Sequence, residues 1–145
     1  MVPVINDIST DLEDVPQFLS NPKLNPLPQG FIPQIKQGYP DLKTLVLPGS
    51  SKESVFAACR SAAGSMKRWA IVMDDPEAGV IEGVSTTLIL RFKDDFTIRV
   101  RENAGSALVD MRSKSRVGKG DLGANAARIS EYFEIVKKAF STPAL

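Results

Sequence analysis

The stretch that decides the fold is DFTIRVRENAGSALVDMRSK, residues 95–114. Apolar and polar residues alternate on both sides of the turn sequence NAGS at 103–106, which is typical of a β-hairpin. A tight turn there gives apolar pairs on one face, Val100 with Val109 and Ile98 with Met111. It gives oppositely charged pairs on the other face, Arg99 with Asp110 and Asp95 with Lys114. Because both faces support the same register, we predict this hairpin with that pairing.

The segments around the hairpin predict the rest of a small α+β fold. Strand-like runs separated by turn residues lie at about 69–74, 80–90, 95–102 and 107–116. Ser50 and Glu53 have capping-box spacing, and the apolar series after them predicts a helix over about 51–67. A second apolar stripe predicts a helix over about 122–140. Short links favour a helix, a four-stranded antiparallel meander and a helix, in a two-layer sandwich with both helices on one face.

The first part of the chain is predicted to be an irregular arm rich in proline. Eight of the ten prolines lie within the first 48 residues, where they oppose long helices and central strands. We therefore divide the chain into a Pro-rich arm at 1–49 and a single α+β domain at 50–145. Residues such as Phe18 and Ile35 give the arm apolar anchors for packing on the domain. Because the first two strands are apolar or neutral on both faces, we expect the arm to cover part of the second face; a ligand there is the alternative.

Composition excludes several classes of function. The sequence has no histidine, which removes Ser-His and Cys-His catalytic pairs and histidine-ligated zinc. Its 18 basic and 17 acidic residues give a net charge of +1, which argues against a nucleic-acid-binding protein and against a polybasic membrane-binding protein. The single Cys59 lies among apolar helix residues and is expected to be a buried structural thiol. We predict no cofactor and no metal site, and we expect a soluble chain without a transmembrane segment or a signal peptide.

The loop region RSKSRVGKGDLGANAARI, residues 112–129, contains GxGxxG at Gly118, Gly120 and Gly123. A dinucleotide-binding loop requires a buried parallel strand before the glycines, whereas the strand here is charged at alternate residues. We therefore interpret the region as a sharp strand-turn-helix junction with Asp121 as the N-cap. An anion site at the start of the helix, flanked by basic side chains, is the alternative.

Polar residues at predicted core positions draw attention to the same junction. Alternation assigns Ser113 and Ser115 to the core side of their strand, and helical periodicity assigns Asn125 to the inner side of the second helix. Buried hydroxyl and amide groups require hydrogen-bond partners. The three residues either lock the loop to the helix or line a polar pocket. The candidate ligand-binding residues are Arg112, Ser113, Ser115, Arg116, Asn125 and Arg128, and no catalytic residue is predicted.

Four segments in this order resemble the bacterial domain-of-unknown-function family DUF1499: INDISTDLEDVPQF, WAIVMDDPEAGVIEGVSTT, FKDDFTIRVR and DMRSKSRVGKGDLGANAARI. The resemblance covers nearly the whole chain and implies that the arm belongs with the domain. It also implies that the last segment, including Gly118, Gly123 and the candidate residues above, is the family's most recognisable block. Relatives often carry an N-terminal membrane or export segment, so the resemblance implies a location in the periplasm or cell envelope.

These observations lead to one hypothesis about function and two alternatives. We expect a non-enzymatic binding or structural module of the cell envelope, with an unknown protein or small molecule as its partner. The first alternative is a histidine-free enzyme in which Arg112 and Arg116 hold an anionic substrate and Asp94 or Asp121 acts as base. The second alternative is a carrier of a small apolar ligand, which predicts an enclosed pocket of at least about 300 Å³.

Overall fold

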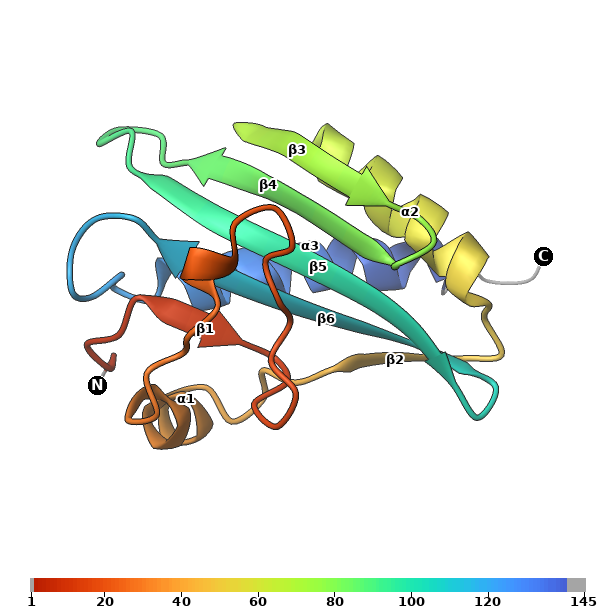
Figure 1. Ribbon diagram of the computed structural model, residues 1–145, viewed down its shortest axis with the longest axis horizontal. Helices are drawn as coiled ribbons and strands as arrows, with labels where there is room; N and C mark the ends of the chain where they lie inside the picture. Colours follow the sequence, from red (N-terminus) through yellow and green to blue (C-terminus); the bar gives the residue numbers. More distant parts are fainter. Residues whose placement is uncertain (1, 141–145) are drawn as a thin grey trace.

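A six-stranded antiparallel sheet carries the fold (Figure 1). The structure, a computed structural model, describes residues 2–140. Its elements, in chain order, are β1 (Asp7–Ser9), the 3₁₀ helix η1 (Pro22–Leu24), α1 (Phe31–Gly38), β2 (Leu45–Pro48), α2 (Lys52–Ser65), β3 (Trp69–Asp75), β4 (Val80–Thr86), β5 (Lys93–Asn103), β6 (Ser106–Ser115) and α3 (Ala124–Phe140). The protein is therefore an α+β protein, as predicted.

The meander β3-β4-β5-β6 and the hairpin at its end are confirmed. The register has every predicted pair: Val100 with Val109, Ile98 with Met111, Arg99 with Asp110 and Asp95 with Lys114. In the turn between β5 and β6, Ala104 and Gly105 have positive φ angles of 51° and 80°. Two successive positive φ angles are what a type I′ turn requires, and this turn matches the twist of the paired strands.

The prediction of a four-stranded sheet was wrong in number, because the arm contributes two further strands. Both pair with the outer edge of β6: β1 with residues 112–114, and β2 with residues 106–109. They contain three and four residues, which is too short for alternation to identify them. The arm also contains α1, where Pro33 lies in the first turn and removes no intrahelical hydrogen bond.

Helices α2 and α3 lie behind the sheet in Figure 1, and the arm lies in front of it. The main apolar core fills the space between the helices and the sheet, and its fully buried side chains include Val55, Ile98, Met111 and Ile129. The hydroxyl of the buried Tyr132 on α3 donates to the Cys59 carbonyl oxygen at 2.7 Å. Burial raises the pKa of the Cys59 thiol to about 12, which keeps it protonated at neutral pH.

The second face of the sheet is charged, and the arm covers these charges. Glu82 on β4 is buried and accepts hydrogen bonds from the backbone N–H groups of Leu19 and Ser20, at 2.5 and 3.2 Å, and from the Ser20 hydroxyl. Arg112 on β6 is completely buried and forms a two-pronged ion pair with Asp7 at 2.8 and 2.9 Å. A buried ionic group without its partner is very unfavourable, so the arm completes this face.

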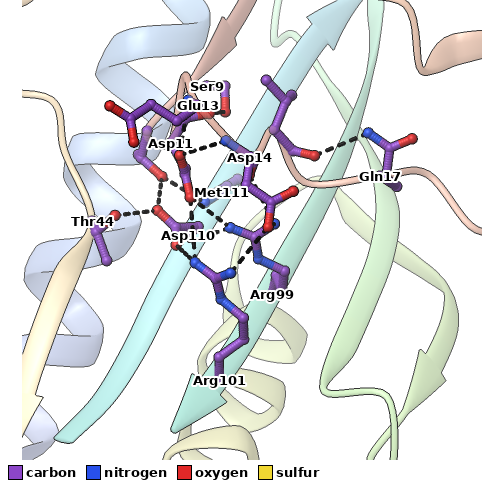
Figure 2. A network of polar contacts seen from close by, with 12 residues as sticks. Ser9, Asp11, Glu13, Asp14, Gln17, Thr44, Arg99, Arg101, Asp110 and Met111 are labelled. Atoms are coloured by element: carbon purple, nitrogen blue, oxygen red, sulfur yellow. Dashed lines mark hydrogen bonds and ion pairs between the residues drawn. The ribbon is translucent and has the colours of Figure 1, made fainter. Parts of the chain in front are cut away.

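Figure 2 shows a second set of charges between the arm and the sheet, which we call the arm latch: Asp11, Asp14, Arg99, Arg101 and Asp110. Asp11 forms ion pairs with Arg99 at 3.0 Å and with Arg101 at 3.3 Å. The buried Asp110 accepts from the hydroxyls of Thr10 and Thr44 at 2.7 and 2.6 Å, and it also pairs with Arg99. The latch thus ties both ends of the arm to neighbouring strands.

We expect acid to weaken the arm latch. Partial burial raises the pKa of Asp11, but hydrogen bonds from the Asp14 and Glu13 backbone N–H groups and the charge of Arg99 outweigh it, so the pKa is lowered overall. A carboxylate with a lowered folded-state pKa stabilises the fold above its unfolded-state pKa, about 3.9 for aspartate, and loses that contribution as the pH falls through the folded-state pKa. The difference in melting temperature between wild type and Asp11→Asn should therefore be largest near pH 7 and shrink below about pH 4. Asp41→Asn, at an exposed position, is the control, and a difference for Asp11→Asn that stays constant down to pH 2 would contradict the expectation.

Candidate functional site

The predicted site residues lie where β4 and β6 end and where β5 and α3 begin. Two loops project there, residues 87–92 between β4 and β5 and residues 116–123 between β6 and α3, and we call them together the tip. They are the green and blue loops at the left-hand end of Figure 1. Both loops line one cleft of about 480 Å³, so they are neighbours in space.

A polar cluster lies beneath the tip, between the end of β6 and the start of α3. The Ser113 hydroxyl donates to Asn125 Oδ1 at 2.6 Å, and Arg128 Nη1 donates to the same oxygen at 2.7 Å. Asn125 Nδ2 donates to Ser115 Oγ at 2.9 Å and to Asp121 Oδ2 at 2.8 Å. Asn125 is fully buried and engages both its carbonyl and its amide groups, so it connects β6, the loop and α3.

Asp94, at the start of β5, extends the polar cluster. Its carboxylate pairs with Arg128 Nη2 at 2.8 Å, and only 3% of the residue is exposed. Burial raises the pKa of Asp94, although the positive charge of Arg128 and a hydrogen bond from Ser115 oppose the shift. The neighbouring Asp95 points to the other face and forms a two-pronged pair with Arg116 at 2.8 and 2.9 Å. This pair raises the pKa of Arg116.

Asp121 lies three residues before Ala124, the first residue of α3. The Gly123 carbonyl oxygen accepts the first helical hydrogen bond, from Ala127 N at 3.0 Å, so the N-cap position belongs to Gly123 and not to Asp121 as predicted. Its carboxylate accepts from the backbone N–H groups of Gly123 at 2.8 Å and of Asn125 at 3.3 Å. Gly118 and Gly123 have φ angles of 87° and 84°, a region that favours glycine. The loop therefore turns sharply, and a side-chain carboxylate takes up free amide groups at the start of the helix.

The structure separates the six candidate residues between the two faces of the sheet. Successive residues of a strand point to opposite faces. Ser113 and Ser115 therefore meet Asn125 and Arg128 on the helix side. Arg112 points to the arm side, where it is buried against Asp7. Arg116 lies at the exposed edge of the tip, paired with Asp95.

The profile of the family described as "Protein of unknown function (DUF1499)" matches residues 7–136. The chain belongs to the DUF1499 family. The match confirms the resemblance seen in the sequence. It extends from β1 into α3, so the arm from residue 7 onward, the polar cluster and the tip all lie inside the matched region. No curated protein matches the sequence.

Sequence reasoning did not predict the exposed apolar surface at the tip of this DUF1499 protein. Large apolar side chains are exposed at the tip, with exposed fractions between 44% and 93%: Leu88, Ile89, Leu90, Phe92, Val117 and Leu122. Residues 87–90 had been predicted as the end of a strand, but β4 ends at Thr86. Thr87 and Phe92 then close a loop through two hydrogen bonds, from Thr87 N to Phe92 O at 2.9 Å and from Phe92 N to Thr87 Oγ1 at 2.8 Å.

A second cleft, of about 540 Å³, borders the polar cluster at Arg128. Its lining includes Trp69, Ser85, Arg128 and Glu131. The Ser85 hydroxyl is buried without a hydrogen-bond partner. In the described residues 2–140, no helix is long and apolar enough to cross a membrane, and no group of three histidine, cysteine or acidic residues is arranged to hold a metal ion.

Proposed function

We propose that this DUF1499 protein is a non-enzymatic binding module whose binding surface is the tip. The observation that carries the proposal is the group of six large apolar side chains exposed on two adjacent loops. Single exposed apolar residues are ordinary, but a contiguous group of them is typical of a surface that binds another molecule.

The polar groups beneath the tip support binding over catalysis. Asp94 is paired with Arg128, and Asp95 is paired with Arg116. A general base must be free to accept a proton from the substrate, and a guanidinium that binds an anionic substrate must direct its N–H groups at that substrate. In these pairs the carboxylates and the guanidinium groups are directed at each other. The raised pKa of Asp94 is the observation that favours the enzyme alternative. That alternative requires a substrate to replace Arg128 at the Asp94 carboxylate.

The cleft at the tip also bears on the carrier alternative. Its volume of about 480 Å³ exceeds the lower end of the range for ligand pockets, about 300 Å³. The cleft opens to solvent, however, and its apolar side chains point outward, as their exposure shows. This form supports docking onto an apolar partner surface more than enclosing a small molecule. The family resemblance supports the cell envelope as the compartment.

A photo-crosslinking amino acid tests the proposal in cells of the source organism. At Ile89, which is 86% exposed at the tip, light is expected to yield a defined adduct that mass spectrometry identifies as an envelope component. Val46 on β2 is the matched control, since it is also exposed but pairs with the opposite end of β6. The proposal fails if Ile89 yields no adduct, or yields the same products as Val46.

A further inference from the structure

We infer that the partner of the tip is the surface of an anionic lipid bilayer, an inference that rests on the proposed function. In this arrangement the apolar side chains enter the boundary between headgroups and acyl chains, and the sheet stays outside. Interfacial binding of this kind reaches about 5–10 Å into the bilayer. It requires no membrane-spanning helix.

The apolar surface extends beyond the two loops of the tip. Residues 2–6 run beside the β6–α3 loop, where Asp121 N donates to Ile5 O at 3.1 Å and Asn6 Nδ2 donates to Gly118 O at 2.7 Å. Val2 and Val4 on this segment are also exposed. Three separate segments therefore present large apolar side chains at the same end of the molecule.

The charges around the apolar side chains are mainly basic. The exposed basic side chains in or next to the two loops include Arg91, Lys93 and Lys119, whereas Asp95 balances the charge of the exposed Arg116. The acidic residues there are already engaged: Asp94 with Arg128, Asp95 with Arg116, and Asp121 with the start of α3. The whole chain has a net charge of only +1, so this basic character is local. Apolar residues surrounded by basic ones complement acyl chains beneath anionic headgroups.

The form of the β4–β5 loop favours a lipid over a rigid partner. Leu88, Ile89 and Leu90 are consecutive, and each is more than 60% exposed. Side chains of three consecutive exposed residues point in several directions, so a flat protein surface cannot cover all of them. A fluid acyl layer can surround each one. A second copy of the chain is also disfavoured, because a symmetric contact would bring Arg91 and Lys119 against like charges.

Vesicle flotation tests this inference with the purified protein. We expect wild type to float with vesicles of phosphatidylcholine and phosphatidylglycerol, and to bind phosphatidylcholine alone more weakly. The double variant Ile89→Ser, Leu90→Ser should bind the mixed vesicles at least about tenfold more weakly, because two apolar side chains no longer enter the acyl region. Val46→Ser should bind as wild type does. Unchanged melting temperatures would show that both variants are folded.

A charge variant tests the basic surroundings separately. Arg91→Gln, Lys119→Gln should lose most of the preference for phosphatidylglycerol and retain the weak binding to phosphatidylcholine. Added salt should reduce wild-type binding to the anionic vesicles for the same reason. An equal loss on both kinds of vesicle would contradict the role assigned to the basic residues.

The outcomes separate this inference from the proposed function. If wild type floats with neither kind of vesicle, but the crosslinker at Ile89 captures a defined protein, the lipid inference is wrong and the binding module stands. If sedimentation shows a dimer that Ile89→Ser, Leu90→Ser dissociates, the partner is a second copy and the lipid inference is also wrong. If the protein neither floats nor forms adducts at Ile89, both proposals fail.

Discussion

Arg112→Met should lower the free energy of unfolding by about 3–5 kcal/mol, the usual loss when one partner of a buried ion pair is removed. The guanidinium group makes its contacts with the arm. Besides the pair with Asp7, it donates to the backbone carbonyl oxygens of Leu24 and Asn25, each at 2.9 Å, and it lies 5.2 Å from the centre of the Phe18 ring. Methionine has similar length but no donors, so the buried Asp7 carboxylate would lose both hydrogen bonds from Arg112 and keep only Lys114 Nζ, at 3.8 Å, as a cationic partner.

Urea unfolding of wild type and Arg112→Met measures this loss. Arg60→Met is the matched control, because Arg60 forms a comparable 2.9 Å ion pair with Asp74 at the surface, where both side chains are about 40% exposed. An exposed pair contributes below about 1 kcal/mol. Equal losses in the two variants would show that Arg112 does not hold the arm on the sheet.

Asn125→Ala should cost about 2–3 kcal/mol, because it removes the hub of the polar cluster. The substitution leaves the Ser113 hydroxyl without its acceptor and deprives Ser115 and Asp121 of a donor. Leaving a buried polar group unpaired costs about 1–3 kcal/mol, and water that enters beside the loop would offset part of the total destabilisation. The β6–α3 loop should therefore lose its attachment to α3.

Two measurements together check this prediction. Urea unfolding gives the stability change, with Ser130→Ala at an exposed position of the same helix as the control. Amide hydrogen exchange should accelerate at residues 116–123 in Asn125→Ala and remain slow in the β5–β6 hairpin. A large loss of stability without faster exchange in the loop would mean that Asn125 supports the core generally and does not hold the tip in place.

The register of the β5–β6 hairpin could be predicted because its signals are local. Alternation and a turn lie within one short stretch, and the pairing on one face agrees with the pairing on the other. The strands β1 and β2 could not be predicted, because they are short and their partner lies far along the chain. Pairing of this kind depends on tertiary contacts that leave no periodic signal in a three-residue segment.

The polar cluster and the tip show the same difference between local and distant information. Alternation along β6 and helical periodicity along α3 predicted that Ser113 and Asn125 face each other. The 2.6 Å hydrogen bond between their side chains agrees with this prediction. Arg112 was grouped with them, but its partner Asp7 lies 105 residues away in the chain. The exposed residues 88–90 were included in a predicted strand, because apolar composition does not distinguish a buried strand from an exposed loop.

The position of β6 has a consequence for how the protein is made. This strand pairs with β5 on one side and with both arm strands on the other, yet it is synthesised after both arm strands and after β3, β4 and β5. Until it emerges, the arm has no strand to join, and the buried charges Asp7 and Glu82 remain in water. Long-range pairing of this kind slows folding and prolongs the exposure of unpaired strand edges. The arm of the newly made chain can therefore pair with the sheet only after β6 has emerged, and molecular chaperones have access to the unpaired arm strands until then.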